Sequence, residues 1–252
     1  MNKKYKQFEQ IVKTMQVNNY DYMKDIHLEK IEKRKSGKEF SFCEHLETLI
    51  FALLSNQRPW KQIADNYLNI KQIFNDFDKE YIKNTDYNFF IEKLLLIKCG
   101  NRQIKKQMQF LKENVLVFEK IESEFGSIDN FINSDSPIGI ANKLANGNKY
   151  KLKQMGLPLV SEYLKGVGVD IIKPDVHVCR ILSRLGFSKN NPATIEEAYK
   201  ICDEIAKENN LTNTEVDSIL WQYCANKFFE CCANKPNCKK CLVDDCKYKK
   251  SL

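Results

Sequence analysis

Residues that form tight turns are scarce in this chain, and their scarcity limits the folds open to it. Only nine Gly and six Pro occur in 252 residues, whereas the helix formers Lys, Glu, Ile and Leu are abundant. Apolar residues recur at helical spacing in a stretch that ends at 55–57 and again in 101–125, and we expect one helix from each. No strand pattern or internal repeat appears. The sequence therefore predicts an all-α protein.

The net charge of the chain bears on whether it binds polyanions, and the length of its apolar stretches bears on where in the cell we expect it. The formal net charge of +7 permits a polyanionic partner without requiring one. Neither the first sixteen residues nor any later stretch has an apolar run of the length that a signal peptide or a membrane span needs. We therefore expect a cytoplasmic protein, associated with the nucleoid if the source is a prokaryote.

Half of the ten cysteines lie close together near the C-terminus, within residues 231–246. In a reducing compartment, clustered cysteines are metal ligands more often than disulfide partners. Cys231, Cys238, Cys241 and Cys246 are separated by six, two and four residues, a set of thiolates that suits a structural Zn ion or a cubane iron–sulfur cluster. Spacing alone does not choose between these two centres, nor between Cys231 and its neighbour Cys232 as the first ligand.

The stretch "LKGVGVDIIKPDVHVCRILSRLGF" (residues 164–187) places a Gly-Val-Gly seven residues before Asp175. If the glycines formed a DNA-binding hairpin, a second helix of about three turns would have to fit before the aspartate, and the gap is too short. Pro158 instead suits the first turn of a helix, while Gly166 and Gly168 suit its C-terminal end. Gly-Val-Gly is therefore predicted to close a helix.

Three motifs, taken in order, resemble the helix-hairpin-helix DNA glycosylases, in particular the endonuclease III-like branch with a C-terminal iron–sulfur loop. "LLSNQ" (53–57) is similar to the family segment whose Gln fills the space left by a flipped nucleotide. "PDVHVCRILSRLG" (174–186) resembles the segment that carries the catalytic aspartate, and the cysteine-rich stretch resembles the cluster loop. The resemblance implies that Asp175 is catalytic, that Gln57 contacts DNA, and that the cofactor is a [4Fe-4S] cluster, with Zn as the alternative. Arg58, which follows Gln57, is a further candidate for contact with DNA.

The resemblance also implies where the hairpin lies. The family places its Gly-rich turn about twenty residues before the aspartate, and Gly156 is nineteen positions before Asp175. Residues 154–158 are thus the expected hairpin, in which backbone amides at the start of a helix hold a DNA phosphate. The expected DNA-binding residues of this segment are Lys151, Lys153, Met155, Gly156 and Leu157.

This hairpin departs from the family pattern at the position that decides the chemistry. Members that also cut the DNA backbone carry a Lys one or two residues after the last hairpin Gly, and Leu157 and Pro158 stand at those positions here. The sequence therefore predicts a monofunctional glycosylase, unless Lys153 or Lys165 reaches the reaction centre. The hairpin also has a single Gly where the family usually has two, and the last cysteine gap is one residue shorter.

The expected architecture is two helical domains that flank a DNA-binding cleft. One is a helical barrel over residues 44–168 that includes the hairpin; the other combines 1–43 with 169–252 and carries the cluster loop at 231–246. The expected function is base excision repair. A monomer would bind double-stranded DNA with a damaged or mismatched base, flip that base, and hydrolyse its N-glycosidic bond with Asp175 and water. Two alternatives stay open: a bifunctional glycosylase/AP lyase, and a noncatalytic metal-containing DNA-binding module in which Asp175 only caps a helix.

Overall fold

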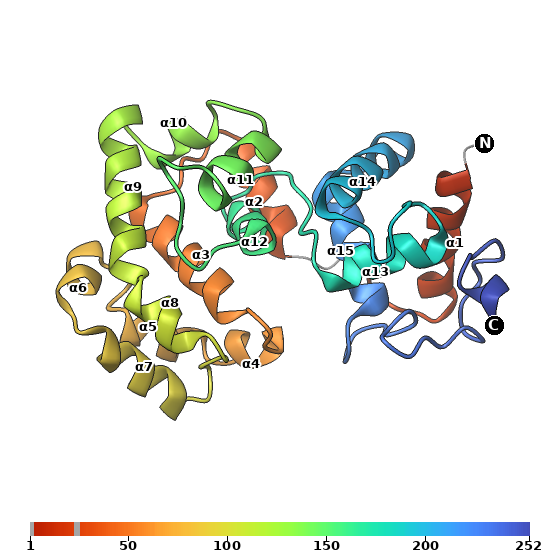
Figure 1. The fold of residues 1–252 in the computed structure, drawn as a ribbon, viewed down its shortest axis with the longest axis horizontal. Helices are drawn as coiled ribbons and strands as arrows, with labels where there is room; N and C mark the ends of the chain where they lie inside the picture. The colour runs from red at the N-terminus through yellow and green to blue at the C-terminus, as the bar shows by residue number, and fades with distance from the viewer. Residues whose placement is uncertain (1–2, 23–25) are drawn as a thin grey trace. The chain divides into compact units, whose positions relative to one another are not determined.

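The computed structural model describes residues 3–22 and 26–252, which form helices joined by loops (Figure 1). No strand occurs in these ranges, so the predicted all-α class is confirmed. The same ranges contain no helix that is both long and apolar enough to cross a membrane. By its internal contacts the chain divides into two compact units, one of Lys30–Val169 and one of Met1–Glu29 together with Asp170–Leu252.

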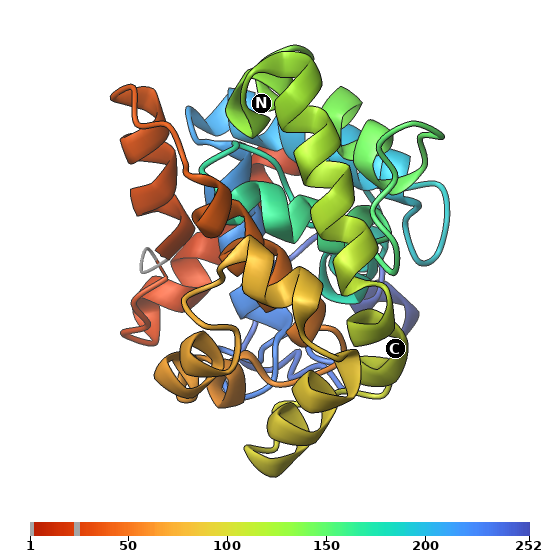
Figure 2. The same ribbon diagram turned by 90° about the vertical axis from the view of Figure 1, so that its left-hand side faces the viewer.

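We call Lys30–Val169 the hairpin unit, because it contains residues 154–158. Its helices pack around aliphatic and aromatic side chains that are almost fully buried. Figure 2 turns this unit toward the viewer and shows the long helix α9 running along the bundle. The unit contains most of α2 (Ile26–Lys35), followed by α3 (Phe42–Leu54), α4 (Trp60–Ala64), α5 (Tyr67–Ile73), α6 (Lys79–Asn84), α7 (Tyr87–Leu96), α8 (Ile104–Gln109), α9 (Leu111–Phe125), α10 (Ile128–Ile132), α11 (Pro137–Ala145) and α12 (Leu157–Gly166).

A buried carboxylate on α10 joins four parts of the hairpin unit. Asp129 is 2% exposed and accepts hydrogen bonds from the guanidinium of Arg34 on α2 and from the backbone N–H of Phe40. Its Oδ1 also lies 3.4 Å from Nε2 of His45 on α3, and Nδ1 of His45 is 2.8 Å from the hydroxyl of Tyr163 on α12. The positive charge of Arg34 compensates for the burial of the carboxylate.

These contacts place the boundary between the units earlier in the chain than the sequence suggested. Residues 30–43 were expected to belong with the C-terminal residues, whereas by their contacts they belong with 44–169. The physical reason is that Arg34 and Phe40 both bind Asp129 within the hairpin unit. Nothing in the local sequence marks this long-range pairing.

The predicted end of α12 is confirmed. This helix begins after the N-cap residue Gly156, carries Pro158 in its first turn and ends at Gly166. Gly168 follows with φ +76°, a left-handed conformation that suits glycine after a helix. Gly-Val-Gly therefore closes a helix and leaves residues 154–156 as the turn that precedes it.

The stretch 101–125 is not the single helix that its apolar spacing predicted. It forms α8 and α9, which meet at Phe110, where the backbone has φ −95° and ψ 1°. Gln107 on α8 is buried and its side chain binds the carbonyl of Leu53 on α3, an interaction between distant parts of the chain. Apolar periodicity continues through the break, so it gave no sign of a second helix.

We call the other compact unit the cysteine unit, because the cysteines of 231–246 belong to it. Helix α15 packs against both α13 and α14, and α1 packs on α14. A loop that follows α15 carries the clustered cysteines and ends in a short 3-10 helix. The helices of this unit are α1 (Lys3–Val17), α13 (Val176–Leu185), α14 (Ile195–Asn209) and α15 (Asn213–Cys224), and the 3-10 helix is η1 (Lys249–Ser251).

We predict that Gly168→Ala destabilises the protein by about 3 kcal/mol or more, because the new Cβ would add a left-handed backbone penalty and overlap the carbonyl oxygen of Lys30. Gly37→Ala is the matched control. Gly37 also has positive φ, at +90°, but a Cβ there would meet nothing within 4 Å, so we expect a loss of only about 1 kcal/mol. Urea unfolding of both variants measures the difference, and equal losses would contradict the role of the Lys30 contact.

Candidate functional site

Asp175 is the N-cap residue of α13. Its Oδ1 accepts hydrogen bonds from the backbone N–H groups of His177, at 2.8 Å, and Val178, at 3.1 Å. Within the described residues, Oδ2 has no hydrogen-bond partner, and the side chain is half-buried. The cap therefore fixes the orientation of the carboxylate and uses only one of its two oxygens.

His177 lies next to Asp175 and is held by a neighbour one turn further along α13. Its Nδ1 is 3.0 Å from a guanidinium nitrogen of Arg180, and its ring meets that of Trp221 edge to face. A guanidinium only donates hydrogen bonds, so Nδ1 is the acceptor and a neutral ring carries its proton on Nε2. Burial lowers the pKa of His177, although the nearby Asp175 raises it. His177 is therefore neutral at neutral pH, which does not suit a general acid.

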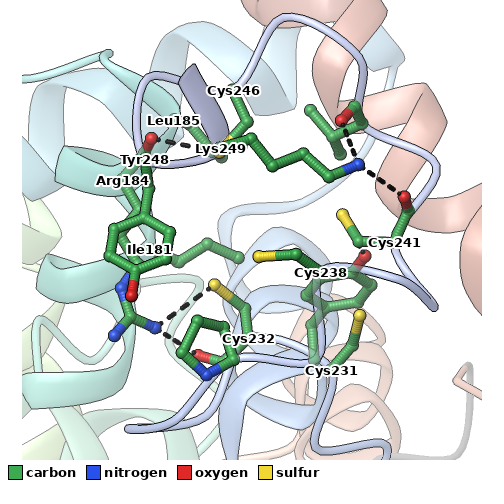
Figure 3. Close-up of a pocket in the computed structure, with 13 residues that line it drawn as sticks. Ile181, Arg184, Leu185, Cys231, Cys232, Cys238, Cys241, Cys246, Tyr248 and Lys249 are labelled. Atoms are coloured by element: carbon green, nitrogen blue, oxygen red, sulfur yellow. Dashed lines mark hydrogen bonds between the residues drawn. The ribbon is translucent and has the colours of Figure 1, made fainter. Parts of the chain in front are cut away.

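The four predicted metal ligands line one pocket of the cysteine unit. Cys231, Cys238, Cys241 and Cys246 all contribute to its wall, as does Cys232 (Figure 3). The loop therefore brings five thiols that span sixteen positions of the sequence to the wall of one pocket. Within the described residues, no three His, Cys, Asp or Glu side chains are arranged so that they could hold a metal ion.

The thiols of this pocket differ in their hydrogen bonds. The sulfur of Cys241 accepts from Cys231 and, at 3.1 Å, from the hydroxyl of Tyr223, and these bonds lower the pKa of Cys241 to about 6. Bonds from Cys224 and Arg184 lower the pKa of Cys232 to about 7. Thiolates are the form in which cysteine binds metals and attacks electrophiles, so both sulfurs are easily converted to that form.

Arg184, near the end of α13, organises the loop on which these cysteines lie. Its guanidinium donates to the carbonyls of Cys232, Ala233 and Asn234, at 3.1, 2.6 and 2.9 Å, and its Cζ lies 4.9 Å from the ring centre of Tyr248. The carbonyl of Arg184 accepts from Cys246. Sequence reasoning missed this residue, since an Arg at the end of a helix carries no signal of a partner about fifty positions away.

The hairpin presents a run of unpaired backbone donors. Within the described residues, the N–H groups of four consecutive residues have no hydrogen-bond acceptor; they are Gln154, Met155, Gly156 and Leu157. Gly156 has an ordinary φ of −79°, and a Cβ there would meet only Pro158 Cδ, at 3.9 Å. Nothing within the hairpin unit requires glycine at this position, so the open space beside the amides is available to a ligand.

The charged residues around the hairpin differ in exposure. Lys151 and Lys153, which lie shortly before the unpaired amides in the sequence, are exposed. Lys165 is 4% exposed, on the buried side of α12. Met155 is 2% exposed, so its side chain belongs to the core and only its backbone faces the turn.

Gln57 lies just beyond the C-terminal end of α3, exposed and in a left-handed conformation with φ +56°. Two buried amides hold this helix end: Asn101 donates to the carbonyl of Leu53 at 2.9 Å, and Gln107 donates to the same carbonyl at 3.1 Å. Sequence reasoning did not identify either amide. The guanidinium of Arg58 donates to the carbonyl of Gly100, so part of the hydrogen-bonding capacity of Arg58 is used within the protein.

The predicted residues therefore divide between the two units. The hairpin unit contains Gln57, Arg58 and the hairpin, whereas the cysteine unit contains Asp175 and the cysteine pocket. Each unit by itself brings together residues that are far apart in the sequence.

Comparisons with known proteins identify two solved structures of related fold. One is an 8-oxoguanine glycosylase/lyase of Methanocaldococcus jannaschii in complex with a 15mer DNA containing 8-oxoguanine, with a TM-score of 0.58 and 21% identity over 85% of this chain and 95% of that chain. The other is an 8-oxoguanine DNA glycosylase of the same organism, with a TM-score of 0.60 and 23% identity over 88% of this chain and 96% of that chain. No protein-family model and no curated protein matches. This likeness shows that the chain shares the fold of these glycosylases.

Proposed function

We propose that this protein is a DNA glycosylase of the helix-hairpin-helix superfamily that acts on a damaged or mismatched base in double-stranded DNA. The observation that carries the proposal is the state of Asp175, whose carboxylate is fixed through one oxygen while the other has no partner within the described residues. A carboxylate in this state, in a fold shared with two DNA glycosylases, suits a reaction that develops positive charge on a sugar.

The proposed reaction is hydrolysis of the N-glycosidic bond. As the bond between sugar and base lengthens, positive charge builds at the anomeric carbon, and the Asp175 carboxylate stabilises it. The same carboxylate orients a water molecule and takes its proton as the water attacks. The two backbone bonds to Oδ1 leave Oδ2 for these tasks without any rearrangement of α13.

The hairpin unit supplies the proposed contacts to DNA. The free amides of 154–157 would hold one backbone phosphate without reading sequence, and Lys151 and Lys153 would add charge to this contact. Gln57, exposed on a rigid helix end, would fill the gap left when the base leaves the stack. Arg58 would donate hydrogen bonds from its remaining N–H groups to the DNA backbone next to that gap.

We propose a monofunctional enzyme, although a structure of related fold is described as a glycosylase/lyase. The first two positions of α12, where a lyase of this family would carry its Lys, hold Leu157 and Pro158. Neither side chain can form a Schiff base. The alternatives are Lys153, which is exposed, and Lys165, which is 4% exposed within the hairpin unit.

We also propose that Cys231, Cys238, Cys241 and Cys246 hold a [4Fe-4S] cluster, as in the endonuclease III-like branch. The chemistry of the donor set suits the cluster, since four thiols from one loop line one pocket and Cys241 readily becomes a thiolate. The thiols would have to move closer together to bind it, because within the described residues no three of them are arranged to hold a metal ion. Cys231 and Cys241 would exchange their mutual hydrogen bond for bonds to iron. The cluster would cross-link the loop and have no part in hydrolysis; Zn is the alternative centre, and Cys232 the alternative first ligand.

We predict that Asp175→Asn lowers the rate of base release by at least about 100-fold, because the variant lacks the charge that stabilises the sugar cation. Asn is a good N-cap residue, so the fold and duplex binding should be retained. The measurement is base release from a panel of duplexes, each with one oxidised, deaminated, alkylated or mismatched base, scored by alkaline cleavage of the abasic product.

Asp170→Asn is the matched control for this experiment. Asp170 also accepts from two backbone N–H groups, those of Asn213 and Thr214, at the start of α15. We expect the control to keep its activity. Equal activity of Asp175→Asn and the wild type would remove Asp175 from the mechanism. Duplex binding by the wild type without release of any base would favour the noncatalytic DNA-binding module.

A second prediction concerns the cluster. Protein purified without oxygen should be brown and contain about four iron atoms with matching sulfide per chain. Cys238→Ser should lose the iron and unfold at a lower temperature, whereas Cys43→Ser, at an exposed cysteine of α3 outside the pocket, should keep both. Stoichiometric Zn in a colourless protein would establish the alternative centre.

A third prediction concerns the sugar chemistry. Borohydride added during turnover should trap no covalent complex between the protein and DNA, because neither Leu157 nor Pro158 offers an amine. The assay is gel electrophoresis of the denatured mixture, with a known glycosylase/lyase as the positive control. If an adduct forms, Lys153→Ala and Lys165→Ala would show which amine is responsible.

A further inference from the structure

A buried side chain of α9 holds the backbone just before the hairpin amides. Asn114 is fully buried, and both hydrogen bonds of its side-chain amide go to Lys153. Its Oδ1 accepts from the Lys153 N–H at 2.6 Å, and its Nδ2 donates to the Lys153 carbonyl at 3.1 Å. This pairing resembles the two bonds by which neighbouring strands hold each other, and it fixes both the position and the orientation of one peptide segment.

The segment that Asn114 holds is under conformational constraint. Gln154, the next residue, has φ +62°, a left-handed conformation that costs a residue with a Cβ about 1 kcal/mol or more. On the other side, the N–H of Leu152 donates to the carbonyl of Leu144 at the end of α11. The side chain of Met155 is buried in the core. The chain is thus held at Leu152, Lys153 and Met155, and the Asn114 contact is the one that binds the backbone directly before the strained residue.

The conformation of Gln154 affects the direction in which the unpaired N–H groups point. The left-handed Gln154 reverses the chain between Lys153 and Gly156, so the four unpaired N–H groups lie within one short turn. Amides in such a turn bind a phosphate well only if they are already oriented, since ordering them during binding would reduce the affinity. Among the described residues, Ser161 also bonds to this backbone, but its hydroxyl donates to the carbonyl of Leu157, at 2.8 Å, and leaves the four N–H groups free.

We propose that Asn114 is a positioning residue for DNA binding: from within the core, it holds the hairpin turn in the conformation that receives a backbone phosphate. This inference rests on the proposed function and extends it, because Asn114 itself touches no DNA. The same bonds would also satisfy a buried amide in a protein that binds nothing. The difference is that a purely structural role changes the stability of the protein alone, whereas a positioning role changes the affinity of folded protein for DNA.

The experiment measures the equilibrium affinity of folded protein for an undamaged duplex, at a temperature well below the unfolding transition of every variant. Asn114→Ala should bind about tenfold more weakly than the wild type, the loss expected when a turn has to be ordered on binding. On a duplex that the wild type processes, the rate of base release at saturating enzyme should stay within about twofold of wild type, because Asp175 is untouched.

Leu94→Ala is the matched control, at a fully buried residue of α7 whose truncation destabilises the same unit through a cavity. Its duplex affinity should stay within about twofold of wild type. Asn114→Ser, whose shorter polar side chain cannot make both bonds to Lys153, serves as a second variant if Asn114→Ala does not fold, and should also bind duplex more weakly than the wild type. Circular dichroism melts establish the folded fraction.

The outcomes separate the two proposals. If the wild type does not bind duplex DNA, the proposed function fails. If the wild type binds and the folded Asn114 variants bind equally well, the proposed function stands and the positioning role is overturned. An equal loss of duplex affinity in Leu94→Ala would also overturn the positioning role, because the loss of affinity would then follow from lower stability alone.

Discussion

Backbone polar groups at the ends of helices have no partner within the helix, and an all-helical protein with many short helices has many such ends. In this chain, polar side chains bind several of the ends that matter for the proposed function. Asp175 binds two N–H groups at the start of α13, and Asn101 and Gln107 bind a carbonyl at the end of α3. The amides before α12 are left without a partner in the described residues, and these are the amides that we propose to bind a DNA phosphate.

Rigid helix ends have a consequence for function. A residue that enters a DNA duplex, or a carboxylate that stabilises a sugar cation, works best when its position is fixed before the substrate arrives. Gln57 follows a helix whose last carbonyls are held from the core, and Asp175 is fixed by the helix that it caps. In the cysteine unit, Arg184 does the same for the loop by binding three consecutive carbonyls.

The sequence predicted the features that depend on local chemistry. The helix class follows from apolar periodicity, and the closure of α12 at Gly166 follows from the positions of Pro158 and the two glycines. The grouping of the cysteines around one pocket follows from their short spacing. In contrast, Arg184 meets the cysteine loop about fifty residues away, and Asn114 meets Lys153 thirty-nine residues away. Contacts of this kind depend on how the helices pack, and the type of a residue alone does not predict them.

The hairpin has a single Gly where the glycosylase family that the sequence resembles usually has two, and the structure gives a physical reason why one Gly is enough. Gln154 stands two residues before Gly156, and it adopts the left-handed conformation that a glycine would adopt at lower cost. Tertiary contacts offset this cost. The buried side-chain amide of Asn114 bonds to both the N–H and the carbonyl of Lys153, and the side chain of Met155 is buried in the core. Gly156, in contrast, has an ordinary conformation and open space around it. Gly156 therefore leaves open space beside the amides, as the proposed phosphate contact requires, while tertiary contacts hold a residue with a side chain in the left-handed conformation at position 154.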